Sequence, residues 1–184
     1  MSGAGNLHRA PAYNRQDVFG GRILYGGVRA RFTGLEANGN LRLQGPDGLS
    51  RTSDGSTLDL AWRTDVVRAT NLDTGEPLPR IAPLRIGATL VYGNGPWNAR
   101  LGFDYNAAQR RVPANTRETE AYTLWNAAIT YGMKAQRARL TWYARIDNLT
   151  NKLAYSPTSI LTTTVYPNAP LPGRTLRIGV RATF

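Results

Sequence analysis

The chain has 184 residues, no cysteine and one histidine, and 23 basic against 12 acidic side chains give it a formal net charge of +11. The lack of cysteine excludes disulfides, thiolate metal sites and cysteine nucleophiles. No run approaches the roughly 18 consecutive apolar residues that a membrane-spanning helix needs, so a helical membrane protein is excluded. The length suits one domain.

The basic charge is dispersed along the chain. Arginines occur singly, and Arg110 and Arg111 are the only adjacent pair. A nucleic-acid interface would need a dense basic stripe, so we expect no nucleic acid partner. The same charges would suit the lining of a polar interior, or attraction to anionic lipopolysaccharide.

The first residues, 1–14, lack the apolar core of a secretory signal. Residues 1–27 are rich in glycine and weakly patterned, so we expect an irregular N-terminal segment, in which residues 18–25 could supply part of a strand. Because an exported chain needs a signal, we expect either a chain that is not exported or the end of a longer one.

From residue 28 onward the chain alternates apolar and polar residues with a period of two, which is typical of strands with one apolar face. The last segment is the most regular, with Leu176, Ile178, Val180, Ala182 and the terminal Phe184 on one face. In the first segment the apolar phase changes at Gly34, which predicts a β-bulge there. Seven strands are predicted, at residues 28–43, 58–66, 84–92, 97–105, 122–131, 139–149 and 174–184.

The connections alternate in length, as they do in outer-membrane barrels. Counted back from the C-terminus, residues 152–173, 107–119 and 71–83 form long connections, and residues 132–136 and 93–96 form tight turns. Residues 44–55 break this rule, because they form a long connection at the end where the other connections are tight turns. The sequence therefore predicts an all-β fold, an antiparallel transmembrane β-barrel.

No enzyme signature is present. The single histidine, His8, lies in the N-terminal segment expected to be irregular, so neither a Ser-His-Asp triad nor a histidine metal cluster is supported. Gly93-Asn94-Gly95 predicts a hairpin turn, because no helix follows it to form a phosphate loop. Acidic and basic residues share the inward face of the predicted strands, and we expect paired charges there instead of an acid/base pair. They are Asp59, Asp65, Asp104 and Asp147 with Arg63, Arg100 and Arg145.

The long C-terminal connection carries the candidate ligand contacts. Tyr155, Thr162, Thr163 and Tyr166 offer hydroxyl groups to a polar ligand, although hydroxyl-rich loops also occur for solubility alone. Asn148 and Asn151 precede it, and for them we expect a structural role in a turn.

Three stretches resemble TonB-dependent outer-membrane receptors. RIDNLTNK at 145–152 resembles a segment of the penultimate strand, with Thr150 where an aromatic residue is commoner. PGRTLRIGVRATF at 172–184 is similar to the C-terminal ending of that family, and LPRIAPLRIG at 78–87 to a stretch that re-enters the barrel. The strand rhythm extends the resemblance back to about residue 28.

The resemblance implies a barrel of about 22 strands with a plug inside it, importing a nutrient such as an iron siderophore with energy from TonB. Residues 28–184 would supply only the C-terminal strands, so we expect a partial barrel that does not function alone and meets TonB only through the missing plug region. The implied partners are outer-membrane lipid and lipopolysaccharide, a small nutrient ligand and the assembly machinery, for which Phe184 would be the signal. The implied location is the outer membrane of a Gram-negative cell, with no enzymatic activity and no cofactor.

Two alternatives remain open at this point. One is a self-contained eight-stranded barrel with a structural or adhesive role, in which residues 18–25 supply the eighth strand. The other is a soluble basic β-protein that binds nucleic acid. It requires the face bearing Leu101, Phe103, Ile178 and Val180 to be buried against a second layer.

Overall fold

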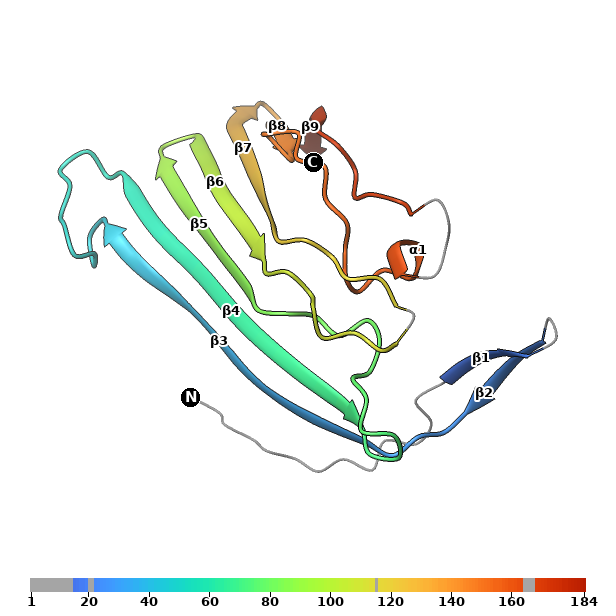
Figure 1. Ribbon diagram of the computed structural model, residues 1–184. Helices are drawn as coiled ribbons and strands as arrows, with labels where there is room; N and C mark the ends of the chain where they lie inside the picture. The colour runs from blue at the N-terminus through green and yellow to red at the C-terminus, as the bar shows by residue number, and fades with distance from the viewer. Residues whose placement is uncertain (1–14, 20–21, 115, 164–167) are drawn as a thin grey trace.

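The computed structural model describes residues 15–19, 22–114, 116–163 and 168–184. These described residues form antiparallel strands and one single-turn helix, α1 (Ile160–Thr163). Seven strands make one open sheet in sequence order, which confirms the all-β fold and the partial barrel (Figure 1). They are β3 (Ala30–Gln44), β4 (Thr57–Asn71), β5 (Arg85–Asn94), β6 (Trp97–Asn106), β7 (Tyr122–Ala135), β8 (Ala138–Asp147) and β9 (Thr175–Thr183).

The two faces of this sheet differ in chemistry. We call the side bearing Leu60, Leu90, Leu101, Ile129, Trp142 and Ile178 the apolar face, and the side bearing Arg42, Asp59, Arg63, Asp104 and Arg145 the polar face. Cross-strand aromatic pairs lie on the apolar face, with ring centroids 4.6 Å apart for Trp97–Tyr131 and 5.3 Å for Phe103–Trp125. Such pairs stabilise neighbouring strands.

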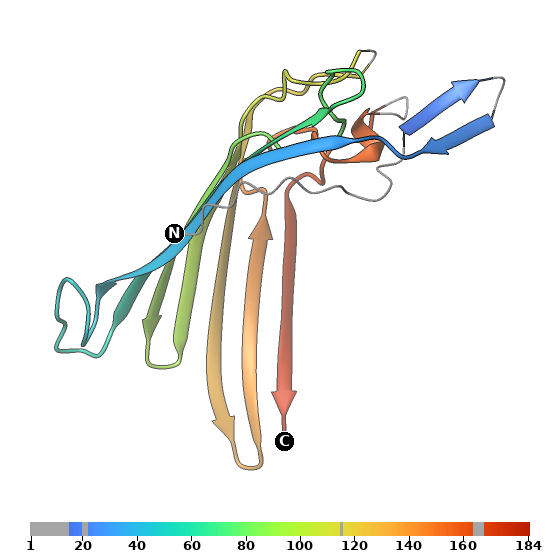
Figure 2. The same cartoon turned by 90° about the horizontal axis from the view of Figure 1, so that it is seen from below.

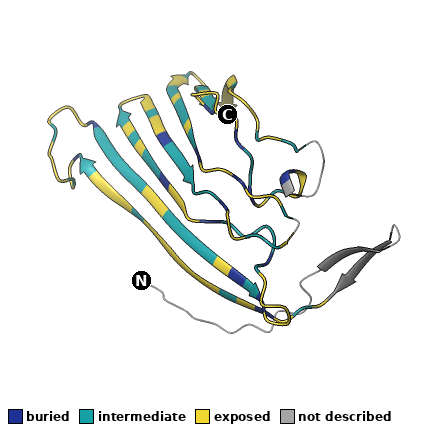
Figure 3. Ribbon diagram, viewed as in Figure 1, coloured by how far each residue is buried: buried dark blue, intermediate teal, exposed yellow. Residues whose placement is uncertain are grey.

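No second layer covers the apolar face in the described part of the chain. Each strand contacts only its neighbours in the sheet, and most of the described strand residues are exposed or half-buried (Figure 3). Leu101 is 46% exposed, Val180 50% and Ile178 71%. The soluble alternative required this face to be buried, and that prediction is wrong.

The predicted bulge at Gly34 is also wrong. The register between β3 and β4 runs without a break through Gly34, opposite Val67, and shifts only between Arg42 and Gln44. The apolar phase changes because the environment of the strands changes. At the start of β3 and the end of β4, the side of the sheet that is apolar elsewhere carries Arg31 and Arg68. The opposite side there carries a small apolar cluster, formed by Ala30, Ala69 and Leu78 with Val28, Phe32 and Ile81.

The connections follow the predicted alternation. Tight turns join β5 to β6 and β7 to β8 at one end of the sheet, and the long connections 72–84, 107–121 and 148–174 gather at the other end (Figure 2). Gly95 lies in the turn between β5 and β6 with a φ of 53°, a left-handed conformation that suits glycine. The Gly93-Asn94-Gly95 hairpin prediction is therefore confirmed.

The N-terminal strands do not join the sheet. β1 (Arg15–Phe19) and β2 (Arg22–Gly26) pair only with each other, as a hairpin near the long loops (Figure 1). Residues 18–19 and 22–25 therefore lie in two short strands outside the sheet, and none of the described residues supplies an eighth strand to it. No helix among the described residues has the length and apolar character needed to cross a membrane.

Candidate functional site

Ion pairs lie on the polar face, most of them between strands. Guanidinium nitrogens lie 2.6 Å from a carboxylate oxygen for Arg63 and Asp104 and 2.9 Å for Arg85 and Asp65, and Arg42 pairs with Asp59. Arg145 and Asp147, 2.8 Å apart at the same kinds of atom, pair within β8. A second arginine, Arg177, also lies near Asp147, with its Nη1 atom 3.7 Å from Asp147 Oδ2. Among the described residues, the prediction of paired charges on this face is confirmed for every predicted residue except Arg100, which forms no ion pair with them. Because the arginine side chains of these pairs are 41–71% exposed, water screens the charges and each pair contributes little stability.

One of these pairs spans an intervening strand. Arg63 on β4 lies opposite Gly87 on β5, and Gly87 lies opposite Asp104 on β6. A Cβ atom at Gly87 would lie 2.9 Å from an Asp104 carboxylate oxygen and 3.0 Å from Arg63 Nε. Glycine therefore leaves the space through which the arginine reaches the aspartate.

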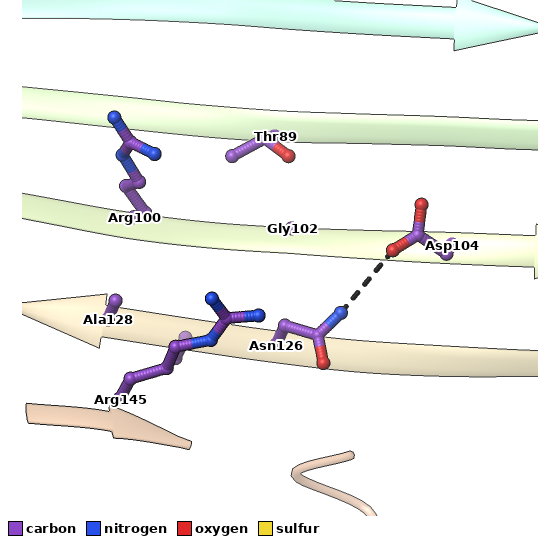
Figure 4. Close-up of a pocket in the computed structure, with 8 residues that line it drawn as sticks. Thr89, Arg100, Gly102, Asp104, Asn126, Ala128 and Arg145 are labelled. Carbon is purple, nitrogen blue, oxygen red and sulfur yellow. Dashed lines mark hydrogen bonds between the residues drawn. The ribbon is translucent and has the colours of Figure 1, made fainter. Parts of the chain in front are cut away.

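A pocket of about 190 Å³ opens on the polar face across β5, β6, β7 and β8 (Figure 4). Arg100 and Arg145 lie on either side of Ala128, because the register places Arg100 opposite Ala128 and Ala128 opposite Arg145. Asn126 donates to Asp104 across 3.4 Å at the other end of the pocket. The full lining is Thr89, Arg100, Gly102, Asp104, Asn126, Ala127, Ala128 and Arg145.

Asn148 and Asn151 organise the start of the β8–β9 loop. Both have a φ of 51°, the left-handed conformation that asparagine tolerates better than most residues. The buried Asn148 amide donates to the carbonyls of Lys152 at 2.9 Å and Pro172 at 3.2 Å and accepts from the Lys152 N–H at 2.8 Å. Asn151 accepts from the Arg174 N–H at 2.9 Å. Their predicted structural role is confirmed.

The candidate ligand residues of this loop differ in their surroundings. Tyr155 is half-buried, and Thr162 is 2% exposed, with its hydroxyl donating to the Ala169 carbonyl at 3.3 Å. Thr163 is the last residue of α1, and Tyr166 lies outside the described residues. Phe184 follows β9 and is 97% exposed, at the end opposite to this loop.

Two residues of the β6–β7 loop have roles that the sequence did not suggest. Arg111 donates from its guanidinium to the Ala69 carbonyl and to the Thr70 hydroxyl, both at 2.7 Å. Gln109 donates to the Ile81 carbonyl at 2.6 Å. The pairing of β4 with β5 stops at Asp65, so the last residues of β4 have no β5 strand beside them. Arg111 supplies hydrogen-bond donors to Ala69 and Thr70 in that part of β4.

An open antiparallel sheet with one uncovered apolar face and one ion-paired face defines a segment of a membrane β-barrel. A family model described as "TonB dependent receptor-like, beta-barrel" matches residues 10–149. The chain belongs to this family, and the resemblance inferred from the three stretches is confirmed.

Among solved structures, a chain named "Copper transporter OprC" superposes with a TM-score of 0.69 at 19% sequence identity. The match covers 92% of this chain and 26% of that transporter, so this chain spans about a quarter of its length. At this identity the likeness shows the fold alone. No curated protein sequence matches the chain.

Proposed function

We propose that this chain forms part of the wall of an outer-membrane transporter that takes up a small nutrient in a Gram-negative cell. The observation that carries the proposal is the uncovered apolar face on a sheet of this family. Side chains such as Ile178 and Trp142 stabilise the protein there only when lipid replaces water around them.

The charges beside the apolar face support outer-membrane lipid and lipopolysaccharide as partners. Arg31 and Arg68 lie on that side of β3 and β4, beyond Leu35 and Val66 at the long-loop end, and both are exposed. Cations just past an apolar band attract anionic headgroups. The long loops would then face outward and the tight turns the periplasm.

Transport by this chain would require the remainder of a barrel. The open sheet leaves one edge of β3 and one edge of β9 unpaired within the described residues. Unpaired backbone groups in lipid cost several kcal/mol each, so both edges need further strands. Energy from TonB would arrive through a plug region, as inferred from the family resemblance.

For the transported ligand we propose an iron siderophore or a similar polar chelate. The β8–β9 loop offers Tyr155 and its neighbouring hydroxyl groups, and the adjoining polar face offers guanidinium groups to an anionic chelate. Equilibrium dialysis of the detergent-refolded chain against an anionic ferric tris-catecholate chelate should show retention, which Tyr155→Ala weakens. Retention of copper(II) salt alone would contradict the substrate class.

The location can be tested through Phe184, proposed as the signal for the assembly machinery. Attached to an export signal in Gram-negative cells, the chain should be recovered from the outer-membrane fraction. Phe184→Ala should reduce that recovery severalfold and Phe184→Tyr, which keeps the aromatic ring, should preserve it. Recovery of all three proteins as soluble periplasmic species would overturn the proposal.

A further inference from the structure

A row of arginines crosses the polar face near the pocket. The register places Arg100, Ala128, Arg145 and Arg177 opposite one another on β6, β7, β8 and β9. Residues opposite one another in a sheet point to the same side, so three guanidinium groups share one row. Ala128 has the smallest side chain in this row, and the pocket of about 190 Å³, which we call the hollow, lies above it between Arg100 and Arg145 (Figure 4).

The hollow has an excess of positive charge. Arg145 and Arg177 share one carboxylate, that of Asp147. Among the described residues, Arg100 takes part in none of the ion pairs. The acid that lines the hollow, Asp104, already accepts from Arg63 at 2.6 Å and from Asn126 at 3.4 Å. Like charges placed opposite each other destabilise a sheet, so this row would be stabilised by an added anion.

The lining suits an oxyanion. Guanidinium forks donate two parallel hydrogen bonds to a carboxylate or phosphate, and here two forks lie on either side of the same space. The Thr89 hydroxyl adds a neutral donor at the edge. A water occupies about 30 Å³ of liquid, so the hollow has room for an anion of several heavy atoms.

We propose that the hollow between Arg100 and Arg145 is a binding site for a small oxyanion, a carboxylate or a phosphate. The anion can be a free solute or the side chain of an acidic residue from another polypeptide segment. This inference concerns the site itself and does not depend on the identity of a transported nutrient.

Calorimetric titration of the detergent-refolded chain with inorganic phosphate, and separately with an end-blocked Gly-Asp-Gly peptide, tests the site. Arg100→Gln should weaken binding at least about tenfold, because charge-assisted hydrogen bonds are lost. Ala128→Leu should abolish binding by filling the hollow while leaving every charge in place. Tighter binding of phosphate would indicate a free solute, and tighter binding of the peptide a side-chain carboxylate.

Arg117→Gln is the matched control, since Arg117 is an exposed arginine in the β6–β7 loop, away from the hollow. It removes the same charge and should leave binding unchanged. Arg100 is exposed, so its replacement should leave the fold intact, as circular dichroism would verify. Equal weakening by Arg100→Gln and Arg117→Gln, unchanged binding in Ala128→Leu, or no binding of either probe would overturn the site.

Discussion

Asn148 holds the β8–β9 loop through its side chain and its backbone together. It is 3% exposed, its amide bonds to residues 152 and 172, and its N–H donates to the Asn126 side chain at 3.0 Å. A buried polar group with its partners satisfied is costly to disturb, because removing it leaves other buried groups unpaired. One residue therefore connects β7, β8 and the far end of a long loop.

Asn148→Ala should lower the free energy of unfolding by about 2–4 kcal/mol, from the lost hydrogen bonds and the strain of a left-handed alanine. Asn148→Gly keeps that backbone conformation and should cost about 1 kcal/mol less. Urea unfolding in detergent micelles measures both values, with Asn40→Ala, at an exposed strand position, as the control. Equal costs for the alanine and glycine variants would contradict the backbone part of the explanation.

Asp73 ties the start of β3 to the β4–β5 loop. The Arg29 N–H donates to its carboxylate at 3.0 Å and the Arg29 guanidinium at 2.7 Å, and these hydrogen bonds hold the pKa of Asp73 below its ordinary value of 3.8. A lowered pKa means that the contribution to stability is complete above pH 3.8. It is lost as the pH falls through the lowered pKa of the folded protein.

The Arg29 amide should therefore exchange faster with solvent, relative to an unstructured amide at the same pH, as the pH is lowered below 3.8. Asp73→Asn removes the titrating group and should abolish this dependence. Hydrogen exchange followed by NMR, in detergent and between pH 2 and 6, gives the measurement. The same pH dependence in Asp73→Asn would show that another group is responsible.

At the scale of the strands, Gly102 decides how closely β5 and β6 can approach. A Cβ atom at Gly102 would lie 2.5 Å from the Thr89 hydroxyl oxygen and 2.9 Å from the Ala88 carbonyl oxygen. The second contact is with backbone, so β5 and β6 would have to separate. At Gly132 on β7 the nearest such atom, the Pro96 carbonyl oxygen, is 3.8 Å away, which is an ordinary contact.

Gly102→Ala should accordingly destabilise the sheet by about 1–3 kcal/mol, the usual cost of overpacking. Gly132→Ala, the matched control in the same sheet, should be neutral or slightly stabilising, because alanine restricts the unfolded chain. Denaturant midpoints of the two variants in one detergent provide the comparison. The prediction fails if the two substitutions shift the midpoint by the same amount.

At the scale of the whole molecule, two surfaces of the sheet lack a covering. The apolar face has no second layer in the described residues, and the outer edges of β3 and β9 have no neighbouring strand. An apolar face requires lipid or detergent, whereas an open edge requires another strand. The two requirements are separate and can be tested separately.

In plain buffer the chain should aggregate. In detergent it should gain strand structure but form concentration-dependent oligomers through its open edges, without a compact monomer band that shifts on boiling. Gel migration of heated and unheated samples distinguishes these outcomes. A heat-modifiable compact monomer would mean that the chain closes on itself, in favour of the eight-stranded alternative, and a soluble monomer in buffer would overturn the membrane assignment.

Seven strands, their two faces and the alternation of loop lengths are all predictable from the amino-acid sequence, because each depends on residues near one another along the chain. A side chain two positions along a strand returns to the same face whatever lies across from it. That rule sorts Asp104 and Arg100 onto the polar face and Leu101 and Phe103 onto the other. The hairpin at Gly95 is equally local and equally predictable.

What lies across from each residue is decided by register and by long-range packing. The pairing of Arg63 with Asp104 depends on Gly87 in the strand between them, and the Arg100–Arg145 hollow depends on Ala128. The change of apolar phase at Gly34 looks like a bulge in the sequence. Its cause is the apolar cluster that includes Leu78, and Leu78 lies in the β4–β5 connection, far from Gly34 along the chain. Local alternation identifies the strands and their faces, whereas the contacts between distant segments that form the site exist only once the sheet is assembled.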